Sequence, residues 1–356
     1  MGSKGKPKVI IGMSGGIDSS VAAALLVNQG YRVTGVTMKT WNEGSPVCRG
    51  SCFSPGQQDG IENARRVAVK LGVPFKVIDL ADEFREHVLN YFCSEYLLGK
   101  TPNPCVRCNR LIKFDLLWRK ALDCGIEADF FATGHYARVS KGYGGRHLLK
   151  KGRDVKKDQS YFLYGLSQRQ LARTMFPLGD YLKQDVRTIC AEMQLDIETG
   201  KESQDFAGGD YSPLFEGKCT PGPIVDRQGN VLGRHRGIVY FTPGQRRGLG
   251  IASREPLYVV DVRAETNTVV VGSLEELQTE EQIVSDANWI ARESPAEDMR
   301  VIVRIRSSHA GYEAVISQLD DGKLVVRYKK PQVGAARGQS IVFYDGDVVL
   351  GGGIAQ

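Results

Sequence analysis

Short apolar runs alternate with helical patterns over the first two hundred residues, and this alternation constrains the fold more than any other feature. The first run, KVIIGM at residues 8–13, is followed by a glycine turn and by a helical stretch rich in Ala and Leu at 17–28. Similar strand-like runs lie at 32–41, 75–80 and 129–133, and helical spacing is found at 61–71, 83–98 and 110–123. Strands separated by such helices predict an α/β fold with a parallel sheet covered on both faces. Ligands of that fold bind at the carboxyl ends of the strands.

The pattern changes after about residue 205, where Gly, Pro and short β-branched runs replace the helices. Residues 238–241 and 257–262 are predicted strands between turn signals. From Met299 onward, the runs VIVRIR, EAVISQL, KLVVRY and SIVFYDGDVVLGGG have the spacing of a small barrel or sandwich. We therefore predict three domains: a parallel-sheet domain at 1–205, a small β-rich domain at 206–285 and a C-terminal β-barrel at 286–356.

Charge and composition place few limits on the partner. The chain has 47 Lys and Arg against 41 Asp and Glu, and the net charge of +6 permits an anionic partner such as nucleic acid without requiring one. No stretch approaches about 18 consecutive apolar residues, and no apolar segment follows the short basic N-terminus. We expect a cytoplasmic protein without a membrane partner, whose eight cysteines are mostly reduced thiols.

The strongest local signal is the hexapeptide SGGIDS at residues 14–19, between the first predicted strand and the first predicted helix. Adjacent glycines let the backbone turn tightly, so that its N–H groups and the helix N-terminus face one point, where a phosphate or pyrophosphate would bind. The hydroxyls of Ser14 and Ser19 add donors. The loop lacks the Lys of a Walker motif and does not match GxGxxG. Asp18 is unfavourable beside a polyanion unless Mg²⁺ intervenes or the side chain caps the helix.

A second signal is TPNPCVRCN at residues 101–109, which continues into Ile112-Lys113-Phe114. Two prolines predict an extended approach, and Cys108 stands just before a helix predicted to begin near Asn109. The positive end of that helix and Arg107 are expected to lower the pKa of the Cys108 thiol, as a nucleophile requires. The Cys-x-x-Cys pair formed with Cys105 also suits a zinc site, an iron–sulfur site or a redox pair, and the spacing does not separate these alternatives.

These motifs carry a resemblance to a known family. SGGIDS resembles the PP-loop of ATP pyrophosphatases, which cleave ATP to AMP and pyrophosphate while adenylating a substrate. The cysteine segment closely resembles the tRNA-specific 2-thiouridylase family. Four further motifs agree with that family along nearly the whole chain, namely TGHYA at 133–137, KDQSYFL at 157–163, GQRRGLG at 244–250 and GGGI at 351–354. The resemblance implies a PP-loop domain similar to adenine nucleotide alpha hydrolases, followed by the two β-rich domains.

The resemblance also implies roles for individual residues. Cys108 would be the nucleophile, with Cys105 and Asp18 as further candidate catalytic residues, and Asn103, Pro104 and Cys105 would face the target base. Residues implied to hold ATP are Gly12, Met13, Ser14, Gly15, Gly16, Ile17, Asp18, Ser19, Met38 and Gly134. Residues implied to touch or recognise tRNA are His135, Lys157, Asp158, Gln159, Arg306, Ser307 and Gln339.

Without the resemblance, several of these residues have a structural interpretation. His135, which follows a predicted strand, is equally a capping or core residue. The run Lys157-Asp158-Gln159 is typical of a solvated surface. Tyr240 and Phe241 would either stack on a base or be buried. A basic cluster, interpreted either as a solvent face or as a phosphate-binding patch, comprises Arg234, His235, Arg236, Arg246 and Arg247.

One position departs from the family pattern. The family carries a second cysteine about a hundred residues after the nucleophile, and Ala207 occupies that position in the run SQDFAG at 203–208. Ala cannot carry sulfur, so three substitutes are considered. Cys219 could act as the carrier, or Cys105 and Cys108 could work together. Alternatively, Cys105, Cys108 and a third thiol (Cys219, Cys48 or Cys52) could hold an iron–sulfur cluster of the [4Fe-4S] type with an open iron.

The implied activity is 2-thiolation of the wobble uridine of tRNA. ATP and Mg²⁺ would adenylate the C2 oxygen, and sulfur supplied by a persulfide or sulfide donor protein would then replace AMP. Two other functions are considered. Another PP-loop enzyme acting on a small molecule would release pyrophosphate without tRNA. A tRNA-binding sulfur-carrier protein without adenylation activity would bind tRNA and release no AMP.

Overall fold

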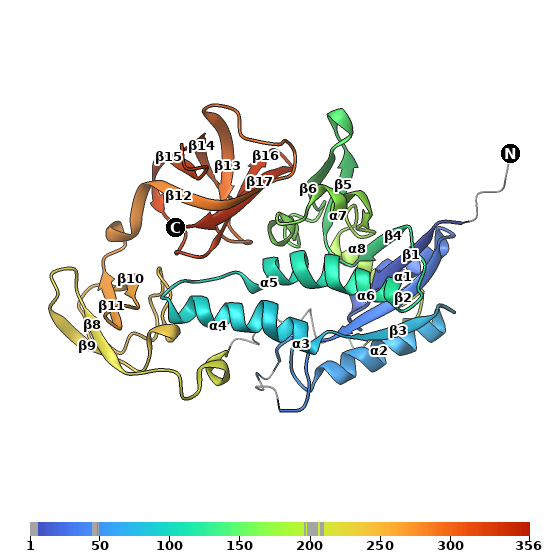
Figure 1. The fold of residues 1–356 in the computed structure, drawn as a ribbon, viewed down its shortest axis with the longest axis horizontal. Coiled ribbons are helices and arrows are strands. Elements are labelled where there is room, and N and C mark those ends of the chain that lie inside the picture. The colour runs from blue at the N-terminus through green and yellow to red at the C-terminus, as the bar shows by residue number, and fades with distance from the viewer. Residues whose placement is uncertain (1–5, 45–47, 49, 196, 198–205, 207–209) are drawn as a thin grey trace. The chain divides into compact units, whose positions relative to one another are not determined.

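The computed structural model of the chain describes residues 6–44, 48, 50–195, 197, 206 and 210–356, and Figure 1 traces them. Two compact units are present. The first comprises residues 1–88, 105–211 and 347–349, and the second comprises 89–104, 212–346 and 350–356. The chain therefore leaves the first unit at residue 89 and returns to it at residue 105.

The first unit is built on a five-stranded sheet with the order β3-β2-β1-β4-β7. All four neighbouring pairs are parallel, which confirms the predicted parallel sheet. Val9, Ile10 and Ile11 of the central strand are almost completely buried, as expected of a strand covered on both faces. The strands are β1 (Lys8–Gly12), β2 (Arg32–Lys39), β3 (Phe75–Asp79), β4 (Phe130–Thr133) and β7 (Thr174–Met175).

Helices cover both faces of this sheet. On one face, Val9, Ile11 and Ala132 join a core with α1 (Ile17–Asn28), α2 (Gln57–Lys70) and α8 (Lys183–Glu192). On the other face, Phe131 contacts Phe114 and Trp118, with ring centroids 5.5 and 6.2 Å away. The first unit also contains two shorter helices, α3 (Ala81–Phe84) and α7 (Gln168–Ala172).

The helix that carries the cysteines starts earlier than predicted. It runs without interruption through α5 (Pro104–Arg107), a π-helical segment (Cys108–Leu116) and α6 (Leu117–Asp123). Pro104 explains the early start, because a proline fits the first position of a helix, where its missing N–H is not needed. The prediction of a start near Asn109 is wrong, and Cys108 lies within the helix. A second π-helical segment (Arg85–Leu89) leads into α4 (Asn90–Leu97).

A hairpin, β5 (Ala137–Lys141) with β6 (His147–Lys151), also belongs to the first unit. Val348 and Val349 pair with β6. The second unit contains a four-stranded sheet with the order β10-β11-β8-β9, made of β8 (Gly222–Val225), β9 (Val231–His235), β10 (Tyr258–Arg263) and β11 (Thr268–Gly272). The strand predicted at 257–262 is confirmed. The strand predicted at 238–241 is wrong, because residues Ile238–Tyr240 form a 3₁₀ turn.

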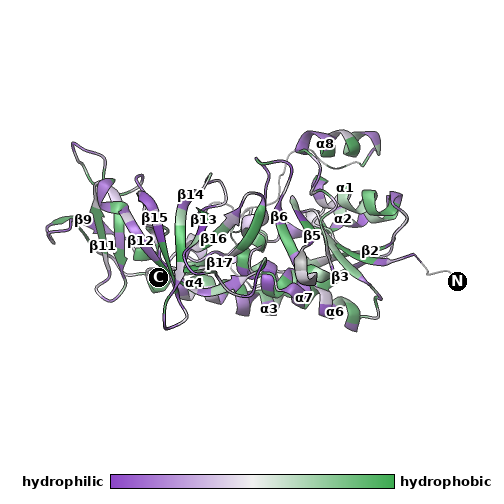
Figure 2. Ribbon diagram, turned by 90° about the horizontal axis from the view of Figure 1, so that it is seen from above, coloured by the Kyte–Doolittle hydropathy of each residue, from purple (hydrophilic) through white to green (hydrophobic). Residues whose placement is uncertain are grey.

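The C-terminal strands of the second unit close into a barrel rather than a sandwich. Their order is β12-β15-β14-β13-β16-β17, and β12 pairs with β17 as well as with β15. Val303, Ile316 and Phe343 are among the fully buried residues of its core. Figure 2 shows hydrophobic residues along the strands and hydrophilic residues in many of the connecting loops. The strands are β12 (Gln278–Trp289), β13 (Met299–Arg304), β14 (Tyr312–Gln318), β15 (Leu324–Val333), β16 (Ser340–Asp345) and β17 (Val348–Ala355).

Candidate active site

The residues expected to hold ATP gather at one edge of the parallel sheet. Residues 13–19, here called the glycine loop, follow the carboxyl end of β1 and lead into α1. Met38 lies near the carboxyl end of the neighbouring β2, and Gly134 directly follows β4 on the other side of β1. The order of the strands reverses between β1 and β4, which is where open parallel sheets bind their ligands.

Close backbone packing explains the glycines of this edge. Gly15 has φ +79°, and a Cβ atom there would lie 2.1 Å from the carbonyl oxygen of Gly60 in α2. A Cβ on Gly134 would lie 2.7 Å from the backbone nitrogen of Ser19. Neither position has room for a larger residue, so the backbone itself forms the surface of the loop.

The hydroxyls of the glycine loop bind within the loop. The backbone N–H of Ser14 donates to Ser19 Oγ at 3.1 Å, and the hydroxyls of Ser14 and Ser19 are 3.2 Å apart. Ser19 Oγ donates to the Gly16 carbonyl at 3.1 Å. Ser14 is exposed and Ser19 is buried. Gly16 is the N-cap of α1 and no side chain caps this helix, which leaves the first N–H groups of α1 available for an anion.

Asp18 does not cap the helix, and its charge is balanced by residues that sequence reasoning missed. Lys183 Nζ lies 2.6 and 2.8 Å from the two carboxylate oxygens, and the Tyr136 hydroxyl donates to Oδ1 at 2.8 Å. Lys183 belongs to α8, 165 residues away in the chain, and no sequence signal links it to Asp18. The ion pair removes the electrostatic objection to an acidic residue in this loop without requiring a metal ion.

The environment of Cys108 differs from the predicted one. Cys108 is buried at the start of the π-helical segment, and burial raises the pKa of its thiol above the ordinary value, while nearby Lys113 acts in the opposite direction. Arg107 Nε donates to the His87 carbonyl. The predicted lowering of the pKa is therefore wrong, because Cys108 lies a full turn inside the helix and is shielded from water.

Three thiols gather in the first unit. Cys52, on the loop before α2, lies close enough to Cys108 and Cys105 for their charges to interact, and Lys113 lies near both Cys52 and Cys108. Burial raises the pKa of Cys52, and the two other thiols raise it further. We call Cys52, Cys105 and Cys108 the thiol cluster. All eight cysteines are thiols without disulfides, which confirms the expectation.

Other predicted tRNA residues of the first unit have structural partners. His135 Nδ1 lies 2.7 Å from Thr133 Oγ1, and its ring packs against Phe114 and Phe176. Burial and the charge of Lys113 hold the pKa of His135 well below its ordinary value, so this side chain is neutral at neutral pH.

The KDQ run is not a fully solvated surface. Asp158 is buried, and its carboxylate accepts hydrogen bonds from the backbone N–H groups of Gly152 and Ser160 at 3.1 Å. Gln159 Oε1 accepts from the backbone N–H of Tyr136 at 2.9 Å. The prediction of a solvated run is therefore wrong for Asp158, and Lys157 is partly exposed.

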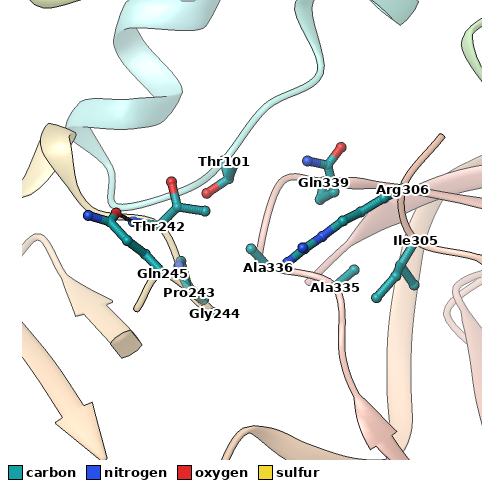
Figure 3. A pocket seen from close by; sticks show the side chains of 10 residues that line it. All are labelled: Thr101, Thr242, Pro243, Gly244, Gln245, Ile305, Arg306, Ala335, Ala336 and Gln339. Atoms are coloured by element: carbon teal, nitrogen blue, oxygen red, sulfur yellow. Dashed lines mark hydrogen bonds between the residues drawn. The ribbon is translucent and has the colours of Figure 1, made fainter. Parts of the chain in front are cut away.

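The second unit contains a pocket of about 340 Å³ that includes two predicted tRNA residues, Arg306 and Gln339 (Figure 3). We call it the Arg306 pocket. Gly244 and Gln245 of the GQRRG motif line its opposite side, and a Cβ on Gly244 would lie 3.2 Å from the Arg306 guanidinium. Asn103 Nδ2 donates to Gln339 Oε1 at 3.4 Å. Ser307 is not among the lining residues.

The predicted basic cluster is smaller than expected. Arg234, Arg236, Arg246 and Arg247 are exposed, but His235 is buried and its Nε2 lies 3.0 Å from the Asn267 carbonyl oxygen. Burial lowers the pKa of His235, so it contributes no charge at neutral pH. The Arg236 guanidinium lies 4.1 Å from the centre of the Tyr240 ring. Phe241 is buried, as one of the two alternatives predicted.

The described residues contain no group of three His, Cys, Asp or Glu side chains arranged to hold a metal ion. The thiol cluster therefore does not fit an iron–sulfur cluster as it stands. Cys219 lies in the second unit, with its Cβ facing Gly237. Ala207 lies outside the described residues. Within the described ranges, no helix is long and apolar enough to cross a membrane.

Comparison with known proteins identifies the family. Residues 7–207 match the family described as tRNA methyl transferase HUP domain, 216–273 match the tRNA methyl transferase PRC-barrel domain, and 279–355 match the aminomethyltransferase beta-barrel domain. The tRNA-specific 2-thiouridylase MnmA 1 of Clostridium botulinum is 45% identical over 99% of both chains. The tRNA-specific 2-thiouridylase MnmA of Acetivibrio thermocellus is also 45% identical, over 99% of both chains. The chain belongs to the tRNA-specific 2-thiouridylase family.

The three matched regions of this 2-thiouridylase family member divide the candidate residues among them. The HUP region contains the glycine loop and the thiol cluster, the PRC-barrel region contains Gly244 and Gln245, and the beta-barrel region contains Arg306 and Gln339. A solved 4-thiouridine synthetase–RNA complex with bound ATP is similar at a TM-score of 0.35 and 17% identity, covering 57% of this chain and 46% of that chain, which is too distant to carry an argument.

Proposed function

We propose that this chain catalyses ATP-dependent 2-thiolation of the wobble uridine of tRNA, using Cys108 in the transfer of sulfur and releasing AMP and pyrophosphate. The observation that carries the proposal is the presence, in one compact unit, of an uncapped helix N-terminus behind a glycine loop and a cluster of three thiols. The first element suits a nucleotide and the second suits sulfur chemistry. Membership of the 2-thiouridylase family supports the combination.

The glycine loop, Met38 and Gly134 hold ATP in this proposal. Backbone N–H groups at the start of α1 bind the phosphates and stabilise the charge that develops on the departing pyrophosphate. Mg²⁺ would accompany ATP on its phosphates and would neutralise part of their charge. Asp18 keeps a positioning role through Lys183 and Tyr136.

The reaction proceeds in two steps. The C2 oxygen of uridine attacks the α-phosphate, a new oxygen–phosphorus bond forms, and the bond to pyrophosphate breaks. A sulfur nucleophile then attacks C2, and the carbon–oxygen bond breaks as AMP leaves. Adenylation is required because a carbonyl oxygen is a poor leaving group, whereas AMP is a good one.

The second unit positions the tRNA. The exposed Arg306 guanidinium in the Arg306 pocket suits a phosphate. The bond between Asn103 and Gln339 ties the segment before Cys105 to this pocket. Lys157, Ser307 and His135 remain proposed tRNA contacts, with His135 acting as a neutral group.

Sulfur reaches the site from a persulfide or sulfide donor protein. Cys108 needs a second sulfur-bearing group, and Cys105, Cys219 and an iron–sulfur cluster are the alternatives raised by the absence of a cysteine at position 207. A thiol mechanism is favoured over a cluster because the described residues show no metal-binding arrangement.

The test is thiolation of a tRNA transcript that carries uridine at the wobble position. Purified protein is incubated with ATP, Mg²⁺, cysteine persulfide and the transcript, and the wobble nucleoside is analysed by mass spectrometry. We expect a gain of one sulfur in place of one oxygen and one AMP per modified tRNA. A Cys108→Ala variant should lose thiolation while ATP binding is retained.

Two outcomes contradict the proposal. Pyrophosphate release that is independent of added tRNA indicates a PP-loop enzyme that acts on a small molecule. Binding of tRNA without AMP release indicates a sulfur-carrier protein. If the Cys108→Ala variant thiolates tRNA as well as wild type does, only the role of Cys108 is refuted.

A further inference from the structure

Transfer of sulfur from a cysteine persulfide requires two thiols, because the bond between the transferred sulfur and its carrier must be broken. After the terminal sulfur of a persulfide attacks C2, that sulfur is still bonded to the sulfur of its carrier cysteine. A second thiol must attack the carrier sulfur, because only then does the carrier release 2-thiouridine. Cys108 can serve as one of the pair, and the question is which thiol is the other.

Cys52 lies within the thiol cluster but on a different element. It belongs to the loop before α2, whereas Cys105 and Cys108 share one helix. The Cys52 carbonyl accepts hydrogen bonds from Thr40 Oγ1 at 2.8 Å and from Gln57 Nε2 at 3.4 Å, so the loop is held against β2 and α2. This anchoring fixes the loop from which the Cys52 thiol interacts with Cys105 and Cys108.

The contacts of Cys52 also point to the segment where a cysteine is missing. Its thiol donates to the Phe206 carbonyl at 4.0 Å, and Phe206 immediately precedes Ala207 in the sequence. The ring of neighbouring Phe53 packs against Phe206, with centroids 5.2 Å apart. The Cys52 thiol therefore lies next to Phe206, the residue that precedes position 207 in the sequence.

The elements that carry the two thiols separate their roles. Cys108 is 6% exposed and lies inside a helix, whereas Cys52 lies in a loop, in a partly exposed residue whose thiol is buried. A loop brings a buried thiol to an external donor with less rearrangement than the interior of a helix does. Lys113 lies near both, where its ammonium stabilises the thiolate that each thiol must form in turn.

We propose that Cys52 is the second thiol of the reaction: it carries the sulfane sulfur, and Cys108 releases that sulfur to the activated base. This inference rests on the proposed function and assigns its missing residue. The thiol cluster thereby provides the second thiol of the reaction, although position 207 is alanine.

The Cys52 thiolate attacks the terminal sulfur of a hydropersulfide donor, forming a Cys52 persulfide and releasing the thiol of the donor. The terminal sulfur attacks C2 of the adenylated uridine, and AMP leaves with the C2 oxygen. The Cys108 thiolate then attacks Cys52 Sγ. A Cys52–Cys108 disulfide forms, the bond from Cys52 to the transferred sulfur breaks, and its electron pair remains on the sulfur of 2-thiouridine. An external dithiol reduces the disulfide by two electrons.

The experiment is a single turnover of the full chain with ATP, cysteine persulfide and the tRNA transcript, without added reductant. We compare wild type with Cys52→Ala, Cys105→Ala and the control Cys124→Ala, whose exposed thiol lies at the end of α6. Cys52→Ala should lose roughly 10³-fold in thiolation, since residues that act as a unit lose nearly all activity when one is removed. Its tRNA-dependent ATP–pyrophosphate exchange should remain. Cys124→Ala should match wild type in both assays.

Peptide mapping after the turnover identifies the thiols that react. We expect a disulfide-linked peptide that joins Cys52 to Cys108 in wild type, with tRNA-dependent yield. A double variant, Cys52→Ala with Ala207→Cys, tests whether a thiol or merely a well-packed side chain is needed. Recovery of thiolation in this variant supports the proposal, because the second substitution restores only a sulfur atom.

Several outcomes overturn the proposal. These are wild-type thiolation by Cys52→Ala, a disulfide joining Cys105 to Cys108 in place of the expected one, and stoichiometric iron and sulfide in anaerobically purified active protein. If wild type shows neither tRNA-dependent ATP–pyrophosphate exchange nor thiolation, the proposed function itself is refuted. Failure of this inference and failure of the proposed function are therefore distinguishable.

Discussion

The glycine loop and the Arg306 pocket present opposite kinds of surface. In the glycine loop, side chains are bound to one another or to remote residues, as in the Ser14–Ser19 and Asp18–Lys183 pairs. A ligand therefore meets the backbone N–H groups of the loop and of the start of α1. In the Arg306 pocket, the exposed side chain of Arg306 faces the space, and the backbone is engaged elsewhere, as where the Gly244 N–H donates to the Val259 carbonyl at 2.8 Å.

This difference has a consequence for mutation. A surface made of backbone depends on close packing, so the loss of a single glycine displaces all of its donors together. A surface made of side chains loses one contact at a time, and its contribution is electrostatic and sensitive to salt. Substitutions in the glycine loop should therefore act in an all-or-none manner, and substitutions in the Arg306 pocket should act in a graded manner.

The largest expected effect comes from Gly15→Ala. The added methyl group would meet the Gly60 carbonyl oxygen at 2.1 Å, and φ +79° is unfavourable for Ala. We expect kcat/KM for ATP to fall by roughly 10²-fold or more, because misplacement by about 1 Å has that effect on a reacting group. The control is Gly56→Ala in the same unit, where φ is −63° and the nearest atom lies 3.8 Å away. Equal activity of the two variants would show that the loop tolerates displacement.

A smaller effect is expected from Lys183→Met. Asp18 would keep its charge beside the ATP phosphates with no cation to balance it and only the Tyr136 hydroxyl as a partner, so KM for ATP should rise by roughly 10–100-fold with tRNA affinity unchanged. The side chains of Lys183 and Asp18 are only 13% and 22% exposed, so solvent screens the pair weakly. Adding Asp18→Asn should recover part of the loss, whereas Lys141→Met on an exposed site of β5 should have no effect. A double variant no better than the single one would refute the charge argument.

Arg306→Ala should act on tRNA alone. Removal of one phosphate contact predicts uniformly weaker binding, with KM for tRNA raised by roughly tenfold and the slope of log affinity against log salt reduced by about one. KM for ATP should be unchanged. The matched control is Arg300→Ala, which removes an exposed arginine of the neighbouring strand β13 outside the pocket. Identical salt slopes for the two variants would show that Arg306 does not contact a phosphate of the tRNA.

Local sequence patterns predicted the parts of the fold that depend on neighbouring residues. The alternation of strands and helices predicted the parallel sheet, and helix Ile17–Asn28 was predicted to the residue. Contiguous motifs likewise predicted the glycine loop and its position at the carboxyl edge. The start of the cysteine helix was missed because two prolines were interpreted as extended chain, although Pro104 occupies the first helical position.

Contacts between distant residues could not be predicted in this way. Lys183 meets Asp18 because α8 packs against α1, and Cys52 interacts with Cys108 from a loop that is separate from the helix of Cys108. Burial is similarly a property of the whole fold. Asp158 and His235 are polar residues in polar runs, yet both are buried. The partners of Asp158, Gly152 and Ser160, lie close in the sequence, whereas His235 meets Asn267, which is 32 residues away.

The smallest expected effect concerns His135, where protonation tests how tightly the first unit is packed. Burial and Lys113 hold the pKa of His135 below the unfolded value, so the folded state favours the neutral form. The stability gained from this preference is present above about pH 6.5 and is lost as the pH falls toward the folded pKa, by at most about 1.4 kcal/mol per pH unit. NMR titration of the five histidines, with His135→Gln as the assignment variant, should show that the His135 ring stays neutral well below the pH at which an ordinary histidine protonates. The free energy of unfolding of His135→Gln should then depend less steeply on pH between 6.5 and 5.5 than that of wild type. A His135 midpoint near 6.5 would mean that water reaches this ring, and His135 would then be as accessible to a tRNA phosphate as the exposed Arg306.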